Sequence, residues 1–183
     1  MISVTSAASL SDISKKTSDQ NCYPTLREGR SEHDTDQSGI TPSSPNNNPQ
    51  PLHMKPTRIN VTSAARTYPI FVAHGLVNEM ERWLSAAGVG SRRFLVSSPT
   101  VWAQHGETIS TALPNTEHLL IPDGEQSKTL NTVTQIYDAL IEHEADRQST
   151  LIAVGGGVLG DTAGFAAATY LRGVDLVHIP TTL

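Results

Sequence analysis

An apolar run followed by three glycines constrains the fold more than any other feature of the chain. Residues 151–154 are apolar without interruption, which is typical of a strand buried on both faces of a parallel sheet. Gly155, Gly156 and Gly157 come directly after this run. Residues without Cβ atoms allow the backbone to turn sharply and to approach a ligand closely. Strand, glycine turn and helix is the order in which α/β proteins present phosphate-binding backbone at the carboxyl edge of a sheet.

The residues after the glycines predict a helix and a further strand. A segment rich in small residues is expected to become helical near Asp161, so that it can pack tightly against its strand. A second apolar run, residues 174–179, predicts the next strand and leads into Thr181 and Thr182. A triple glycine is not the spaced G-x-G-x-x-G fingerprint, so spacing alone leaves a nucleotide site and a purely structural tight turn equally open.

Strands and helices alternate along the chain from residue 54 onward. The patterns predict strands at 58–63, 68–73, 93–97 and 117–122, and helices at 76–87, 98–113 and 127–144. The first two strands are expected to form an antiparallel pair, and Ser127 is the expected N-cap of the last helix. This alternation favours an α/β, Rossmann-like, mostly parallel sheet with helices on both faces.

Residues 1–53 differ in composition from the rest of the chain. They are rich in Ser, Thr, Asn, Asp and Pro, and such a segment buries too little apolar surface to offset the entropy lost on ordering. The segment lacks the apolar core of a secretory signal, and its acidic residues argue against a transit peptide. We expect either a disordered tail or an over-extended start, with translation beginning at Met54; N-terminal sequencing of the native protein distinguishes the two.

Charge and cysteine content bear on the partners and the compartment. The net charge of −5 does not favour binding to nucleic acid or to an anionic membrane. No apolar run has the length of a membrane span. Cys22 is the only cysteine, so no intrachain disulfide can form and a reducing, cytoplasmic compartment is the simpler expectation. The seven histidines are scattered, and their spacing predicts no metal ligands in this chain.

A polar motif follows the strand predicted at 117–122. It consists of Asp123, Gly124, Glu125, Gln126, Ser127 and Lys128. One interpretation is a turn between strand and helix with an N-cap. In the other, the motif lies at the carboxyl edge, where Glu125 offers an acceptor for ribose hydroxyls and Lys128 a cation for a phosphate or a substrate oxyanion.

The amino-acid identities in these segments indicate a family more specifically than the spacing of the motifs does. The sequences GGGVLGD, AGFAAATYLRG and IPTTL, with IPDGEQSKT upstream, closely resemble 3-dehydroquinate synthase, the cyclising enzyme family of the shikimate pathway. The resemblance covers roughly residues 54–183. It implies a phosphate-eliminating lyase that uses NAD and a divalent metal, zinc or cobalt. Such an enzyme converts 3-deoxy-arabino-heptulosonate 7-phosphate to 3-dehydroquinate and phosphate.

The resemblance also implies roles for individual residues. The implied cofactor contacts are Asp123, Gly124, Glu125, Gln126, Ser127, Lys128, Gly156, Gly157, Val158, Leu159, Gly160, Asp161, Thr181 and Thr182. Backbone N–H groups of the glycine turn would hold the pyrophosphate. Since a carboxylate repels phosphate, Asp161 is expected to bind ribose or the nicotinamide side, unless it serves only as a cap. Lys128 would also contact the substrate.

Arg172 has two interpretations. As the last residue of a small-residue helix, it is usually a solvated charge that favours the helix dipole. In the family, the arginine of Y-x-R-G reaches the substrate phosphate in the neighbouring subunit of a homodimer, and a planar guanidinium suits that contact.

The chain departs from the family pattern in two places. Residues 97–101 lack the acidic residue that often binds the adenine-side ribose. The family's metal ligands and a lysine-bearing segment lie beyond Leu183, so we expect a fragment or truncated product that is inactive alone and unstable without partners. Three alternatives remain open: another sugar phosphate cyclase, a glycerol- or iron-dependent dehydrogenase, and a non-catalytic NAD-binding fragment or pseudoenzyme.

Overall fold

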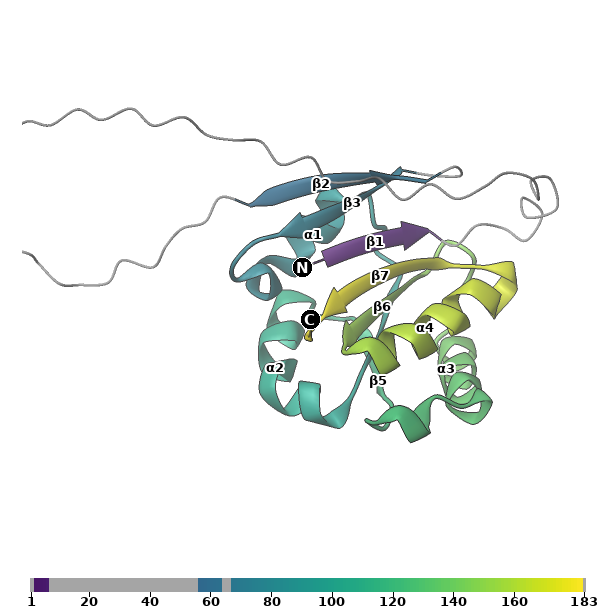
Figure 1. Cartoon of the computed structure of the whole chain (residues 1–183). Coiled ribbons are helices and arrows are strands. Elements are labelled where there is room, and N and C mark those ends of the chain that lie inside the picture. The colour runs from purple at the N-terminus through teal and green to yellow at the C-terminus, as the bar shows by residue number, and fades with distance from the viewer. Residues whose placement is uncertain (1, 7–55, 64–66, 183) are drawn as a thin grey trace, which may run out of the picture.

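The chain folds around one seven-stranded sheet, as a computed structural model that describes residues 2–6, 56–63 and 67–182 shows (Figure 1). The strands are β1 (Ile2–Ser6), β2 (Thr57–Thr62), β3 (Thr67–Val72), β4 (Arg93–Ser97), β5 (Glu117–Leu120), β6 (Thr150–Gly155) and β7 (Asp175–Pro180). The α-helices are α1 (Met80–Ala86), α2 (Pro99–Ala112), α3 (Leu130–Glu142) and α4 (Gly157–Thr169). The 3-10 helices among these described residues are η2 (Leu76–Glu79), η3 (Glu125–Ser127) and η4 (Tyr170–Arg172).

The sheet has a parallel part and an antiparallel part. Its order is β2-β3-β1-β7-β6-β4-β5, and neighbouring strands from β7 to β5 are parallel. The predicted Rossmann-like arrangement is therefore confirmed for these four strands, whose carboxyl ends share one edge. β2 and β3 form the expected antiparallel pair, and β1 lies between β3 and β7, antiparallel to both.

Strand β1 differs from the expectation of a disordered tail. Ile2–Ser6 pairs with β7 in the register Ser3↔His178 and with β3 in the register Ile2↔Phe71. A short segment with β-branched residues gains backbone hydrogen bonds from both neighbours, a gain that the average composition of the first fifty-odd residues hides. The remaining tail, with Cys22 and the alternative start at Met54, lies outside the described residues.

Two helix starts differ from the sequence prediction. Helix α3 begins at Leu130, where the side chain of Thr129 accepts a hydrogen bond from the backbone of Thr132 at 3.2 Å. Ser127 instead ends η3, because the backbone leaves helical geometry at Lys128; η3 is preceded by Gly124, whose φ is positive at 93°. Helix α4 begins at Gly157 rather than near Asp161, since the last glycine of the turn is already helical.

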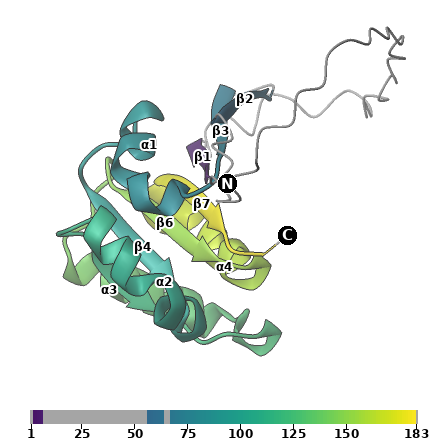
Figure 2. The ribbon, with the colours of Figure 1, turned by 90° about the vertical axis from the view of Figure 1, so that its left-hand side faces the viewer.

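Helices cover both faces of the sheet, as predicted. Alternate residues of the parallel strands point to opposite sides. Phe94 and Leu151 belong to the core under α3 and α4, whereas Leu95 and Ile152 belong to the core under α1 and α2. Figure 2 views the molecule from the end at which the arrow of β7 points in Figure 1. The loops of the carboxyl edge therefore face the viewer there.

The small residues of α4 set how closely this helix approaches the sheet. Ala163, Ala166 and Ala167 have no exposed surface and pack with Leu176 of β7 in one core. Side chains of this size allow α4 to lie directly on β6 and β7, as the sequence predicted. The first turn of α4 is therefore fixed next to the end of β6.

Candidate functional site at the carboxyl edge of the sheet

The structure brings three predicted segments together at the carboxyl edge. Lys128 Nζ lies 2.9 Å from Asp161 Oδ2, which joins the polar motif after β5 to the first turns of α4. The backbone N–H of Thr181 donates to the carbonyl of Gly155 at 3.1 Å, which joins the end of β7 to the glycine turn. Residues 123–128, 156–161 and 181–182 therefore form one surface, here called the cofactor edge.

The three glycines of the turn have different surroundings. An added Cβ at Gly155 would lie 3.1 Å from Leu159 Cδ1, and one at Gly156 would lie 3.2 Å from Thr182 Oγ1. At Gly157 an added Cβ would meet nothing within 4 Å. Packing therefore accounts for the first two glycines, whereas the third leaves the start of α4 open to solvent.

The N-terminus of α4 is not capped by a side chain. Its N-cap is Gly156, which makes no side-chain cap hydrogen bond, whereas α2 is capped by Ser98 and α3 by Thr129. The first N–H groups of an α-helix have no partner within the helix. Among the described helices longer than ten residues, α4 is therefore the one whose N-terminal donors and dipole remain available to an anion.

Lys128 is held between two carboxylates. Its Nζ atom lies 2.9 Å from Asp161 Oδ2 and 3.0 Å from Glu125 Oε1. The hydrogen bonds to Asp161 and then to Glu125 raise the pKa of Lys128 above its ordinary value, so the side chain stays charged. Both carboxylates are largely exposed, and each retains acceptor capacity for hydroxyl groups of a ligand.

Asp123 faces a different partner. Its Oδ2 atom accepts a hydrogen bond from Thr100 Oγ1 at 2.8 Å, at the N-terminus of α2. Hydrogen bonds from Ser98 and then from Thr100 hold the pKa of the Asp123 carboxyl below its ordinary value. Ser98 and Thr100 were not predicted as part of the site. Residues 97–101, which contain no acidic residue, are thus contacted by the carboxylate of Asp123 from the loop after β5.

The other predicted contacts divide into exposed and buried side chains. Gln126, Thr181 and Thr182 are exposed at the cofactor edge, whereas Leu159 is 5% exposed and belongs to the core. Leu159 can therefore offer a ligand only its backbone. At Gly160, an added Cβ would lie 3.3 Å from His178 Nδ1, so close packing explains this glycine.

A cavity of about 300 Å³ adjoins the cofactor edge between α3 and α4. It is lined by Lys128, Thr129, Leu130, Val133, Asp161, Thr162 and Phe165. The ion pair of Lys128 and Asp161 forms its polar side, and Leu130 and Phe165 are exposed large apolar residues. Sequence patterns did not predict this cavity, because it depends on how two helices on one face are spaced.

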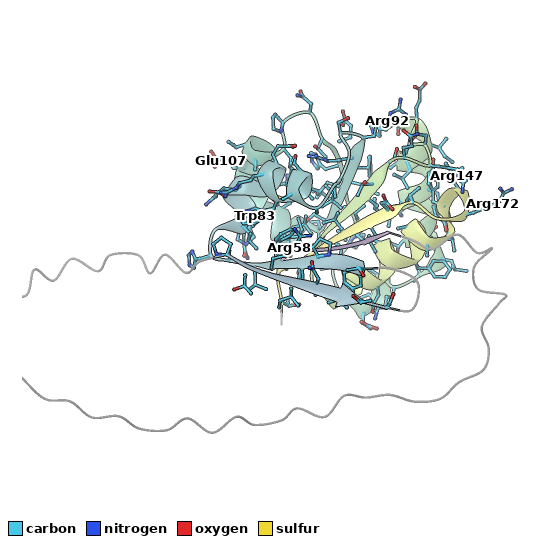
Figure 3. The ribbon with its side chains drawn as sticks, turned by 90° about the horizontal axis from the view of Figure 1, so that it is seen from above. Arg58, Trp83, Arg92, Glu107, Arg147 and Arg172 are labelled. Carbon is cyan, nitrogen blue, oxygen red and sulfur yellow. The ribbon has the colours of Figure 1, made fainter. Side chains whose placement is uncertain are left out.

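Arg172 does not join the cofactor edge. It lies after the last turn of α4, at the end of that helix opposite Gly156, and its side chain points away from the fold (Figure 3). Leu171 and Arg172 both have left-handed backbone conformations, with φ of 49° and 71°. The predicted contact of Arg172 with a neighbouring subunit remains a prediction.

The described residues contain neither a cluster of metal-binding side chains nor a membrane-spanning helix. Within them, no cluster of three or more His, Cys, Asp and Glu side chains is arranged to hold a metal ion. No helix among residues 2–6, 56–63 and 67–182 is both long enough and apolar enough to cross a bilayer.

We expect the stability of the chain to fall as the pH drops below about 6.5, partly because of His178. Burial lowers the pKa of His178, and the negative charge of Asp161 partly opposes this effect. The unfolded state then binds the proton more tightly, so stability rises with pH, by at most about 1.4 kcal/mol per pH unit for one group. Replacing His178 with Gln should make the melting temperature less dependent on pH between 5 and 7. An unchanged pH dependence would contradict this assignment.

The parallel strands, the glycine turn and the uncapped helix define a class, the open α/β domain with a glycine turn and an uncapped helix N-terminus at its carboxyl edge. The chain belongs to the 3-dehydroquinate synthase family: residues 118–183 match the family model described as 3-dehydroquinate synthase N-terminal.

Sequence relatives agree with this membership. The 3-dehydroquinate synthase of Pelotomaculum thermopropionicum is 41% identical over 129 residues, which cover 68% of this chain and 35% of that protein. The 3-dehydroquinate synthase of Pseudomonas aeruginosa (strain LESB58) is 43% identical over 127 residues, which cover 68% of this chain and 34% of that protein. The chain thus spans about a third of the length of these relatives.

A solved structure shares the fold. The crystal structure of 2-deoxy-scyllo-inosose synthase matches with a TM-score of 0.62 and 26% identity, over 68% of this chain and 36% of that chain. A second structure of this enzyme, complexed with carbaglucose-6-phosphate, NAD+ and Co2+, matches with a TM-score of 0.60 and 26% identity.

Proposed function

We propose that this chain is the N-terminal, NAD-binding part of a 3-dehydroquinate synthase. The complete enzyme would convert 3-deoxy-arabino-heptulosonate 7-phosphate to 3-dehydroquinate and phosphate, in the cytoplasm. Family membership supports the reaction. The observation that carries NAD binding is the first turn of α4, which has no side-chain cap and opens to solvent at Gly157.

Different residues of the cofactor edge would bind different parts of the dinucleotide. Backbone N–H groups of Gly157 and Val158 would donate to the pyrophosphate, where the helix dipole favours negative charge. Glu125 and Asp161 would accept hydrogen bonds from ribose hydroxyls. Thr181 and Thr182 would offer exposed groups to the ligand. Bound NAD supplies a transient oxidation of a substrate hydroxyl without net consumption of the cofactor.

The metal and the substrate belong to the proposal for the whole synthase. Zinc or cobalt would polarise the oxygen atoms of the substrate, but the described residues contain no ligand set that fits either ion. The substrate is a sugar phosphate, and the proposed assembly is a homodimer. The exposed side chains of Leu171 and Arg172, on a backbone strained into the left-handed region, support a contact outside the protomer.

Titration of the purified chain with NAD+, followed by calorimetry, tests the cofactor proposal. We expect saturable binding that weakens with added pyrophosphate, because both anions would compete for the N-terminus of α4. No detectable binding at millimolar NAD+ would contradict it.

A second candidate function is another sugar phosphate cyclase, which the structural match to 2-deoxy-scyllo-inosose synthase favours. Phosphate release by the complete synthase separates the two. Release from the heptulosonate phosphate but not from glucose 6-phosphate supports dehydroquinate synthesis, and the reverse preference supports the alternative.

A further inference from the structure

The loop of residues 123–128 is attached at both ends to neighbouring helices. At its start, Asp123 Oδ2 accepts hydrogen bonds from Thr100 Oγ1 at 2.8 Å and from the backbone N–H of Thr100 at 3.4 Å. At its end, Lys128 Nζ lies 2.9 Å from Asp161 Oδ2 on α4. The loop therefore connects α2, which follows β4, to α4, which follows β6.

The N-terminus of α2 is suited to hold a carboxylate. Pro99 is the first residue of α2 and has no N–H, so the backbone N–H of Thr100 is the first donor that the helix offers. Ser98, the N-cap, is 3% exposed, and its Oγ atom accepts a hydrogen bond from the backbone N–H of Val101 at 3.4 Å. The positive end of this helix is thus filled by a side chain of the protein itself. Of the two long-helix N-termini at the ends of β4 and β6, only that of α4 stays open.

The loop between its two attachments is internally fixed. Ser127 Oγ donates to the carbonyl of Asp123 at 3.1 Å, and the backbone N–H of Ser127 donates to the carbonyl of Gly124 at 2.9 Å. The backbone N–H of Lys128 donates to the carbonyl of Glu125 at 3.1 Å. Because of these bonds, we expect a shift of Asp123 to move Glu125 and Lys128 as well.

We propose that Asp123 is a positioning residue: it docks this loop on the N-terminus of α2 and so places Glu125 and Lys128 at the cofactor edge. It does not itself bind the cofactor. This inference rests on the proposed function as far as it concerns NAD, although the docking itself does not. It also divides the predicted D-G-E-Q-S-K contacts into an anchor, Asp123, and the groups that face the ligand.

Removing the partner of Asp123 tests the proposal. Thr100→Val keeps the size of the side chain and removes its hydroxyl donor, and we expect NAD affinity to fall about fivefold, roughly the effect of one hydrogen bond. Asp123→Ala should cause a similar or larger loss, and the double variant should bind no more weakly than Asp123→Ala. If Asp123 contacts NAD directly, Asp123→Ala loses affinity while Thr100→Val does not, and the proposal is overturned.

Two variants act as controls. Thr100→Ser keeps the hydroxyl and should restore affinity. Thr111→Val, also on α2, removes a hydroxyl that donates to the carbonyl of Glu107 at 2.8 Å, and should bind NAD as the wild type does. An equal loss in Thr111→Val and Thr100→Val would point to a general weakening of α2 and would overturn the assignment.

Amide hydrogen exchange tests the docking without NAD. We expect the amides of Ser127 and Lys128 to exchange faster in Thr100→Val and in Asp123→Ala, and at the wild-type rate in Thr111→Val. Unchanged exchange in the first two variants would overturn the positioning role. If the wild-type chain does not bind NAD but exchange responds as expected, the proposed function fails while the docking of the loop stands.

Discussion

Replacing Gly157 with valine is expected to lower NAD affinity at least ~100-fold and to change the melting temperature by less than about 4 °C. An added Cβ at this position meets nothing within 4 Å, so the folded protein can accommodate a side chain. Valine is also a better helix former than glycine. The same open space is where we expect the pyrophosphate to approach the first N–H groups of α4, and branched methyl groups would exclude it. Calorimetric titration and thermal unfolding measure the two effects separately.

Gly90→Val is the matched control for this variant. Gly90 is exposed, has no left-handed φ, and its added Cβ also meets nothing within 4 Å, but it lies in the loop before β4, at the opposite edge of the sheet. We expect Gly90→Val to bind NAD like the wild type. Full affinity in Gly157→Val would place the pyrophosphate elsewhere.

Replacing Ile152 with alanine is expected to lower the free energy of unfolding by about 2–5 kcal/mol. Ile152 has no exposed surface and lies in β6, which pairs with β4 on one side and β7 on the other. Removing its outer carbon atoms leaves a cavity in the core under α1 and α2, because close-packed neighbours relax only in part. Urea unfolding followed by circular dichroism measures the change.

Two variants bracket this effect. Ile152→Val should cost about 0.5–1.5 kcal/mol, and Ile141→Ala, at a position 64% exposed on α3, should change stability by less than about 0.5 kcal/mol. Equal effects at positions 141 and 152 would contradict the assigned core. A cooperative transition of the wild-type chain that NAD stabilises would contradict the expectation that the chain is unstable without partners.

Local patterns were sufficient to predict much of the parallel part of the fold. The apolar run at 151–154 and the glycines after it predicted β6 and its turn, because burial and backbone freedom are properties of neighbouring residues. Strand β1 was not predicted, since it depends on pairing between Ser3 and His178, which lie far apart in the sequence. The cap is at Thr129 because the backbone leaves helical geometry at Lys128, and the polar residues around Ser127 do not reveal this break.

In the candidate site, too, local motifs predicted some features, whereas others depend on contacts between distant segments. The sequence motifs predicted that Lys128, Asp161 and Thr182 contact one cofactor; in the structure their segments meet at one edge, and the contact itself remains a prediction. Whether each side chain faces a ligand or another part of the protein could not be read from the motif. Asp123 turns toward Thr100 because β4 and β5 are neighbours in the sheet, and strand order is a long-range property.

The length of α4 separates two tasks that the family assigns to one reaction. Thirteen residues of α-helix extend about 20 Å, so the guanidinium of Arg172 and the turn at Gly157 lie at opposite ends of this helix. If Arg172 binds a substrate phosphate, that substrate is bound to another chain. Two copies of the complete synthase would then form two catalytic centres or none, and we expect that dilution to monomers would abolish the turnover of the complete synthase while leaving its NAD binding intact.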